Sequence, residues 1–137
     1  MKKSSSLAPR AVTHHQVGPS HVTFESGAKR SKVIKGRFDL VPTHALRRVA
    51  ERYALGASLY GEWNWQKGFP LSDLFNHIQE HLMAYRDRWQ KAKEEHPEAT
   101  DEEVCILIAA TTNDDDLAGA AWGILTLMEL EKRGRLS

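Results

Sequence analysis

Cysteine and long apolar runs are scarce in this sequence, and each scarcity excludes a class of protein. Cys105 is the only cysteine among the 137 residues, which rules out an intramolecular disulfide and a zinc site built from cysteines. The longest strongly apolar run, residues 104–110, is far shorter than the roughly 20 residues that cross a bilayer. The basic N-terminus is not followed by the apolar segment of a secretory signal, so we expect a cytoplasmic protein without membrane contact.

Net charge is also small. The 19 basic and 18 acidic residues leave a formal charge of +1 at pH 7, which gives no reason to expect a nucleic acid polymer or an anionic membrane as a partner. P-loops, dinucleotide-binding fingerprints, serine nucleophile elbows and HExxH motifs are all absent from the sequence. A hydrophobic fraction of 41% in 137 residues is sufficient for one domain with a single core.

Apolar residues recur at helical spacing from residue 43 onward. We predict one helix over residues 43–60, with Pro42 in its first turn and Gly61 at its end. A second helix is predicted over residues 71–95, where the apolar stripe is the most regular in the chain.

The C-terminal part of the chain predicts two more helical segments. Thr100 and Glu103 form a capping box ahead of the apolar run at 104–110. We interpret that run as a short helix, with a strand as the alternative because several of its residues are β-branched. The last helix is predicted from about residue 113 to residue 133. The apolar residues expected to face inward on it are Leu117, Ala121, Ile124, Leu125 and Met128.

Amphipathic helices of these lengths form an all-α bundle. Met83, Trp122 and Leu130 are apolar but lie outside the main stripes, which indicates a second buried face and predicts a homodimer or homotetramer. The folded domain is predicted over residues 27–137, beginning with a basic loop. Residues 1–26 show no sustained period and are expected to be a flexible N-terminal tail.

Three adjacent carboxylates, Asp114, Asp115 and Asp116, lie at the start of the last predicted helix. Acidic residues at a helix N-terminus cap the helix and interact with its positive end, and this structural role is one interpretation. Adjacent carboxylates also repel one another unless cations screen them, and oxygen-rich clusters are what Mg²⁺ and Mn²⁺ prefer. The sequence alone leaves both interpretations open.

His77, Glu80 and His81 are neighbours on the second helix at three- and four-residue spacing. A carboxylate there, facing those of the last helix, predicts a cation site inside the bundle, with a solvated polar face as the alternative. At about 100° per residue, His81 and Asp116 fall at the edges of their apolar stripes, where helices form grooves. Glu80 lies nearly opposite its stripe and reaches a buried site only if a second helix or subunit covers that face.

The loops add basic and aromatic residues suited to a nucleotide. The basic residues could neutralise phosphates, arginine bidentately. Either tryptophan could stack on a base and the asparagine could hydrogen-bond its edge, whereas the alternative role of the tryptophans is to anchor the loop to the core. The residues concerned are Lys29, Arg37, Trp63, Asn64, Trp65 and Lys67.

Four short motifs follow one another along the chain. They are Gly27-Ala28-Lys29, Arg37-Phe38-Asp39-Leu40-Val41-Pro42, Asn64-Trp65 with Lys67-Gly68, and Ala120-Ala121-Trp122. Their order resembles the dATP/dGTP diphosphohydrolase family, which is common in phages and related to the all-α MazG-like pyrophosphohydrolases. The resemblance covers residues 27–132 and implies a MazG-like helical bundle.

The resemblance also implies a reaction and its cofactors. A purine deoxynucleoside triphosphate, with dGTP favoured and dATP as the alternative, is expected to be hydrolysed to its monophosphate and pyrophosphate with two or three Mg²⁺ or Mn²⁺ ions, adjusting the phage deoxynucleotide pool. Glu80, Asp115 and Asp116, with His77 or His81, are expected to hold the ions. Glu80 and Asp116 are the predicted catalytic residues. The alternative is a non-catalytic nucleotide-binding regulatory module, because the family's E-x-x-E and E-x-x-D motifs are each changed at one position.

Overall fold

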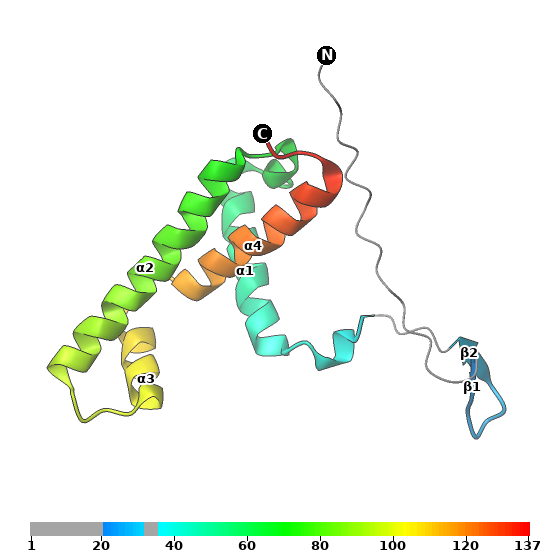
Figure 1. Cartoon of the computed structure of the whole chain (residues 1–137), viewed down its shortest axis with the longest axis horizontal. Coiled ribbons are helices and arrows are strands. Elements are labelled where there is room, and N and C mark those ends of the chain that lie inside the picture. The colour runs from blue at the N-terminus through cyan, green and yellow to red at the C-terminus, as the bar shows by residue number, and fades with distance from the viewer. Residues whose placement is uncertain (1–20, 32–35) are drawn as a thin grey trace, which may run out of the picture. The chain divides into compact units, whose positions relative to one another are not determined.

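The computed structural model describes residues 21–31 and 36–137 of the chain. They divide into a first unit that ends at Val41 and a second unit, Pro42–Ser137, and each is described by itself (Figure 1). The all-α bundle that the sequence predicts is confirmed, because four helices make up most of the second unit.

The first unit contains a short β-hairpin. Strands β1 (His21–Thr23) and β2 (Lys29–Ser31) pair antiparallel, and Gly27 supplies a positive φ of 84° in the turn between them. A 3₁₀ turn, η1 (Phe38–Leu40), follows. The sequence predicts no strand in these segments, because strands exposed on both faces carry no apolar alternation. Residues 1–20 of the predicted tail lie outside the described residues.

The second unit contains α1 (Thr43–Tyr60), α2 (Leu71–Glu95), α3 (Asp101–Thr111) and α4 (Asp116–Arg133). A 3₁₀ turn, η2 (Asn64–Lys67), connects α1 to α2. The bounds of α1 and α2 are those that the apolar period predicts. Among the described residues, none of the helices has the length and apolar character of a membrane span.

Local capping explains where three of the helices begin or end. Gly61 ends α1 with a φ of 94° that L-residues rarely adopt. Thr100 and Glu103 form both bonds of the predicted capping box, at 3.2 and 2.8 Å, so the apolar run after them is a helix rather than a strand. Asp115 caps α4 by accepting a hydrogen bond from the Ala118 amide, which places the helix start at residue 116 rather than near 113.

The core forms where α4 packs closely against α2, while α1 packs on α4 and α3 on α2 (Figure 1). Two glycines of α4 make this approach possible. A Cβ on Gly123 would lie 2.6 Å from Cγ1 of Ile78, and one on Gly119 would lie 2.7 Å from the His81 ring. The buried apolar residues of this core are Leu74, Ile78, Val104, Ile108, Ala118, Ala120 and Leu130.

The face of α4 that points inward is the opposite of the predicted one. Small residues and Leu130 are buried, while four of the five large or apolar residues expected inside are exposed: Leu117, Ile124, Leu125 and Met128. Leu130, assigned from the sequence to a second face, therefore belongs to the core of the single chain. Close packing against α2 selects glycine and alanine, so hydrophobicity alone gave the wrong face.

The C-terminal segment holds the loop between η2 and α2 in place. Phe69 and Leu136 form a parallel bridge, the Leu71 amide donates to the Ser137 carbonyl over 3.0 Å, and the Ser137 amide donates to the Phe69 carbonyl over 3.3 Å. The Arg133 guanidinium lies 5.0 Å from the centre of the Trp65 ring, a cation–π distance. Main-chain pairing thus fixes the position of this loop.

Replacing Gly68 by alanine is expected to destabilise the fold more than replacing Gly61. Both glycines have a φ of 94°, so the backbone strain of an alanine is nearly the same at the two positions. A Cβ on Gly68 would also lie 2.4 Å from the Arg135 carbonyl oxygen, whereas one on Gly61 meets nothing within 4 Å. Urea unfolding of the two variants should differ by about 1–3 kcal/mol. Equal losses would show that the C-terminal segment does not constrain this loop.

Candidate metal centre and adjoining pocket

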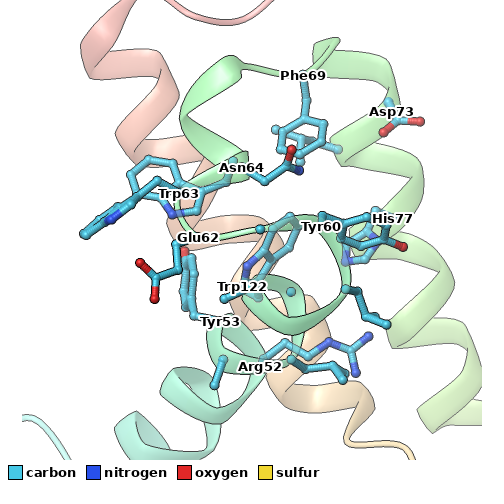
Figure 2. Close-up of a pocket in the computed structure, with 18 residues that line it drawn as sticks. Arg52, Tyr53, Tyr60, Glu62, Trp63, Asn64, Phe69, Asp73, His77 and Trp122 are labelled. Atoms are coloured by element: carbon cyan, nitrogen blue, oxygen red, sulfur yellow. The ribbon is translucent and has the colours of Figure 1, made fainter.

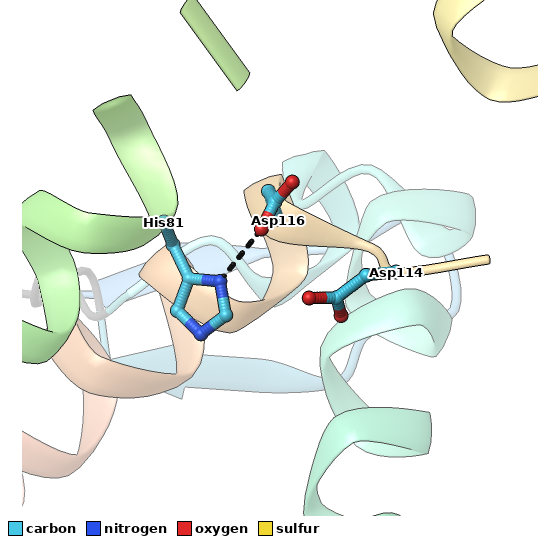
Figure 3. Close-up of side chains that lie close together, drawn as sticks. All are labelled: His81, Asp114 and Asp116. Atoms are coloured by element: carbon cyan, nitrogen blue, oxygen red, sulfur yellow. Dashed lines mark hydrogen bonds and ion pairs between the residues drawn. The ribbon is translucent and has the colours of Figure 1, made fainter. Parts of the chain in front are cut away.

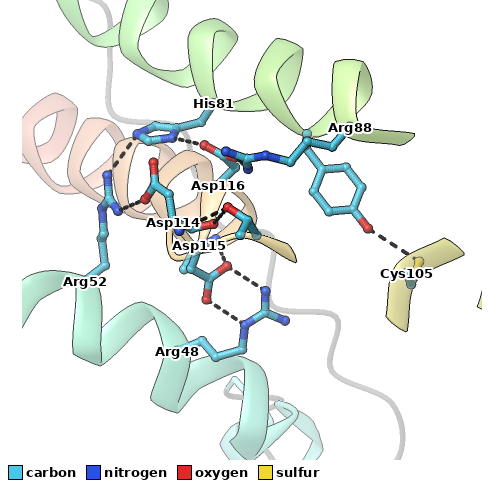
Figure 4. A network of polar contacts seen from close by, with 11 residues as sticks. Arg48, Arg52, His81, Arg88, Cys105, Asp114, Asp115 and Asp116 are labelled. Atoms are coloured by element: carbon cyan, nitrogen blue, oxygen red, sulfur yellow. Dashed lines mark hydrogen bonds and ion pairs between the residues drawn. The ribbon is translucent and has the colours of Figure 1, made fainter. Parts of the chain in front are cut away.

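The three carboxylates at the start of α4 each meet an arginine (Figure 4). Two of these arginines lie four residues apart on α1: Arg48 binds Asp115 bidentately at 2.8 and 2.7 Å, and Arg52 binds Asp114 at 2.8 Å. The third, Arg88 of α2, binds Asp116. Sequence reasoning missed all three arginines. The four-residue spacing of the first two was the available signal, because it places both on one side of α1.

Asp115 is occupied by structural contacts. One of its carboxylate oxygens caps the Ala118 amide over 3.1 Å and both oxygens accept from Arg48. The Arg48 hydrogen bonds hold the pKa of the Asp115 carboxyl below its usual value. The capping interpretation of the acidic run therefore describes Asp115, while its predicted role as a metal ligand remains a prediction.

Asp116 and His81 form the buried part of the cluster. Asp116 is 3% exposed, and its Oδ1 lies 2.8 Å from Nδ1 of His81. The other ring nitrogen of His81, Nε2, lies 3.1 Å from Nη2 of Arg52. A guanidinium can only donate, so Nε2 is the accepting nitrogen and the proton is on Nδ1, which donates to Asp116. Burial, followed by the charge of Arg52, lowers the pKa of His81 and keeps this neutral form.

His81, Asp114 and Asp116 together form a candidate cation site (Figure 3). One ligand atom from each residue lies within 4.8 Å of the other two. Asp114 and the accepting Nε2 of His81 meet the same Arg52 guanidinium and fit one divalent cation there, while Asp116 holds the other ring nitrogen of His81. Two protein donors leave coordination positions for water or phosphate. Two of these residues, His81 and Asp116, were predicted as ligands, and Asp114 belongs to the acidic run that the sequence identified.

A pocket of about 800 Å³ opens beside this cluster, between α1, η2, α2 and Trp122 of α4 (Figure 2). Arg52 and His77 line the pocket, and each also contacts His81 of the cluster. Six of the 18 residues that line the pocket are aromatic, which suits the flat face of a base. The aromatic residues are Tyr53, Tyr60, Trp63, Trp65, Phe69 and Trp122.

The η2 loop places two of its predicted residues in the pocket wall. Asn64 lines the pocket, and so does Trp65, which packs edge-on against Tyr53 with ring centres 6.3 Å apart. Trp63 precedes η2 in the left-handed conformation and is 64% exposed at the pocket. Trp65 thus takes the anchoring role, and Trp63 stays mostly exposed with its ring centre 6.3 Å from that of Trp65. Lys67, on the same turn, is exposed and is not part of the pocket wall described.

His77 occupies a different position from the one predicted for a ligand. Its ring packs edge-on against His81 and Trp122, with centres 4.6 and 5.1 Å away. Its Nε2 is buried and has no hydrogen-bond partner among the described residues. Burial, followed by the charge of His81, lowers the pKa of His77. It is a wall of the pocket and is not one of the three grouped donors.

Three further predicted residues are not among the grouped donors. Glu80 is exposed on α2, so a role in catalysis or metal binding depends on a second copy covering that face. In the first unit, Lys29 lies on β2, and Arg37 binds Asp39 bidentately at 2.8 and 2.6 Å. The phosphate-binding role predicted for these two basic residues stays a prediction.

Taken together, the helical bundle and this site define a class: all-α proteins with a carboxylate–imidazole cluster beside an aromatic pocket. Residues 25–137 match the family model described as dATP/dGTP diphosphohydrolase, N-terminal, and the chain belongs to this family. No curated protein and no solved structure matches the chain. The family match confirms the resemblance that the four sequence motifs indicate.

Proposed function

We propose that the chain hydrolyses a purine deoxynucleoside triphosphate, dGTP rather than dATP, to the monophosphate and pyrophosphate. The observation that carries the proposal is Arg52, which contacts both Asp114 and His81 of the cation cluster and also lines the aromatic pocket. A base held in that pocket would have its phosphates directed toward the cluster. The family match supports this reaction.

In this proposal His81, through Nε2, and Asp114 hold Mg²⁺ or Mn²⁺, and Asp116 orients His81 through Nδ1. Divalent ions bound there would polarise the α-phosphate and lower the pKa of a bound water. Arg88 fixes the other oxygen of the Asp116 carboxylate, and Asp116 in turn fixes the His81 ring, so this metal ligand is oriented before substrate arrives. A ligand side chain held in this way does not have to change its conformation when the cation binds.

The aromatic wall would recognise the base. Trp63 offers an exposed ring to stack on a purine, and the Asn64 amide offers both a donor and an acceptor to its edge. Trp65, held between Tyr53 and Arg133, keeps the loop in position. A purine has the larger ring face, and this favours it over a pyrimidine in a pocket lined by six aromatic rings.

A second candidate function is a nucleotide-binding module without catalysis. Its support is that all three carboxylates of the acidic run have arginine partners, so the cluster is neutralised by the protein's own side chains. Such a module would bind the nucleotide in the same pocket. Only turnover separates the two candidates.

Separation of reaction products tests the proposal. The purified chain is incubated with each deoxynucleoside triphosphate and Mn²⁺ or Mg²⁺, with and without EDTA. Release of dGMP and pyrophosphate from dGTP, abolished by EDTA, supports the enzyme. Nucleotide binding without any turnover supports the binding module and contradicts the proposal.

A homodimer or homotetramer is part of the proposal. Among the described residues, α1 contributes none to the buried core, and its Tyr53 hydroxyl is tied to Thr126 of α4 at 2.8 Å. Large apolar side chains remain exposed on both helices, which is typical of a surface that a second copy covers. They include Leu46, Leu55, Leu59, Ile124, Leu125 and Met128.

Light scattering coupled to size exclusion is expected to give at least twice the mass of 15.5 kDa calculated for one chain. Replacing Met128, which is 64% exposed, by glutamate should lower the measured mass, because a charge on a covered apolar face must be desolvated. The matched control is Glu131→Gln, an exposed change on the same helix that introduces no charge. A monomer in the unaltered chain would contradict the assembly.

A further inference from the structure

We propose that Arg52 is a latch that couples cation binding to nucleotide binding. In the absence of a cation its guanidinium bridges Asp114 and His81, and when a divalent cation binds the guanidinium moves to the phosphates of the nucleotide. The inference rests on the proposed function for the identity of the nucleotide. The part of the inference that concerns cation binding rests on the contacts of Arg52 alone.

The contacts of Arg52 occupy the electron pairs that a cation needs. Nη1 donates to Oδ1 of Asp114 at 2.8 Å, and Nη2 donates to Nε2 of His81 at 3.1 Å. Because Nδ1–H of His81 is donated to Asp116, Nε2 is the nitrogen that can coordinate a metal. The same lone pair cannot serve both partners. A cation bound through His81 Nε2 therefore displaces the Arg52 guanidinium.

The displaced guanidinium has an anion-binding position available to it. Its side chain is 20% exposed and lines the pocket beside the cluster (Figures 2 and 4). Arginine stays charged at any physiological pH, so leaving it near a cation and without an anion is costly. Phosphate oxygens accept two parallel hydrogen bonds from a guanidinium. A triphosphate in the pocket thus stabilises the open position, and each ligand strengthens the binding of the other.

Neither of the other two arginines of the network both competes with a cation and lines the pocket. Arg48 holds Asp115, which is outside the grouped donors, and Arg88 holds the oxygen of Asp116 that His81 does not use. Neither is among the residues that line the pocket described here. Arg48 is therefore a matched control for Arg52: it carries the same charge, lies four residues away on α1 and makes comparable ion pairs.

Mn²⁺ affinity without nucleotide tests the latch, measured by electron paramagnetic resonance of free Mn²⁺. Arg52→Met should bind Mn²⁺ at least about fivefold more tightly than the unaltered chain, and clearly more tightly than Arg48→Met, which loses the same charge. Arg52→Lys keeps the charge but has one point donor in place of the fork, so it should also bind Mn²⁺ more tightly. Equal effects of Arg52→Met and Arg48→Met would mean that only charge matters, and no Mn²⁺ binding by any variant would mean that no competition exists. Either result overturns the latch.

The nucleotide half is tested with dGTP in which an imido group replaces the α,β-bridging oxygen. After subtraction of the Mn²⁺ chelated by free analogue, saturation with the analogue should raise the Mn²⁺ affinity of the unaltered chain at least about fivefold more than that of Arg52→Met. An equal rise in both overturns the coupling. Failure of the proposed function would appear separately, as absence of dGTP turnover while Mn²⁺ affinity still responds to the Arg52 variants. Circular dichroism confirms that each variant is folded, and Arg52→Lys serves if Arg52→Met is not.

Discussion

Replacement of Asp116 by asparagine lowers kcat/KM for dGTP hydrolysis about 10–100-fold, the usual cost of changing a group that orients a metal ligand. Asparagine keeps the size of the side chain and its hydrogen bond to His81 Nδ1, but it removes the negative charge that strengthens His81 as a ligand. Asp116 is almost completely buried, so bulk water cannot replace it at the site. The measurement is steady-state turnover with Mn²⁺, accompanied by thermal unfolding to confirm the fold.

Asp115→Asn is the matched control for this result. Asparagine caps a helix as well as aspartate does, so the Ala118 amide keeps its partner and α4 keeps its start. The change also removes the same charge one residue away. Turnover is expected to fall less than about tenfold, which is below the range for changes around metal ligands. If Asp115→Asn is as damaging as Asp116→Asn, the ligand set is that of the sequence prediction and not that of the grouped donors.

The second large effect is expected from adding one methyl group to each glycine of α4. Alanine normally stabilises a helix relative to glycine by about 0.5–1 kcal/mol. Here the added Cβ at Gly123 would lie 2.6 Å from Ile78, and the one at Gly119 would lie 2.7 Å from the His81 ring. Overpacking of this kind costs about 1–3 kcal/mol, so both variants should unfold at lower urea concentration.

The two glycine variants should differ in function although they are four residues apart on one helix. Gly119→Ala displaces His81 from Asp116 and Arg52, so Mn²⁺ affinity should fall at least about tenfold. Gly123→Ala mainly meets Ile78, an apolar residue, and should change Mn²⁺ affinity much less. Gly56→Ala is the control for helix propensity, because a Cβ there meets nothing within 4 Å, and it should stabilise the fold. Destabilisation by Gly56→Ala but not by Gly123→Ala would refute the close packing of α2 and α4.

The helices could be predicted from the sequence because their signals are local. Capping residues and apolar spacing give the bounds of α1 and α2, and the Thr100 capping box identifies α3. The inward face of α4 could not be predicted in the same way. Its buried side follows from how closely α2 approaches, and hydrophobicity favours the large residues that stay exposed, such as Met128.

The site could be predicted in part. His81 was proposed as a ligand because its position at the edge of the α2 stripe depends on helical phase, which is local. Asp116 was proposed with the acidic run, but the stripe used to place it is the face of α4 that stays exposed. The pairing of Arg48, Arg52 and Arg88 with the acidic run joins residues 28 to 67 positions apart, and no spacing rule reports contacts of that range. Those arginine contacts, together with the capping contact of Asp115, decide which of the three carboxylates can take part in a cation site.

Anomalous diffraction tests the central claim most directly. Crystals of the chain are soaked with Mn²⁺ and the imido analogue of dGTP, and data are collected at the manganese absorption edge. The account predicts an anomalous peak bonded to His81 Nε2 and Asp114, with Asp116 on His81 Nδ1, the purine against Trp63 and the phosphates against Arg52. A manganese peak bound elsewhere, for example at Glu80 without His81, or no peak beside a bound nucleotide, would contradict it.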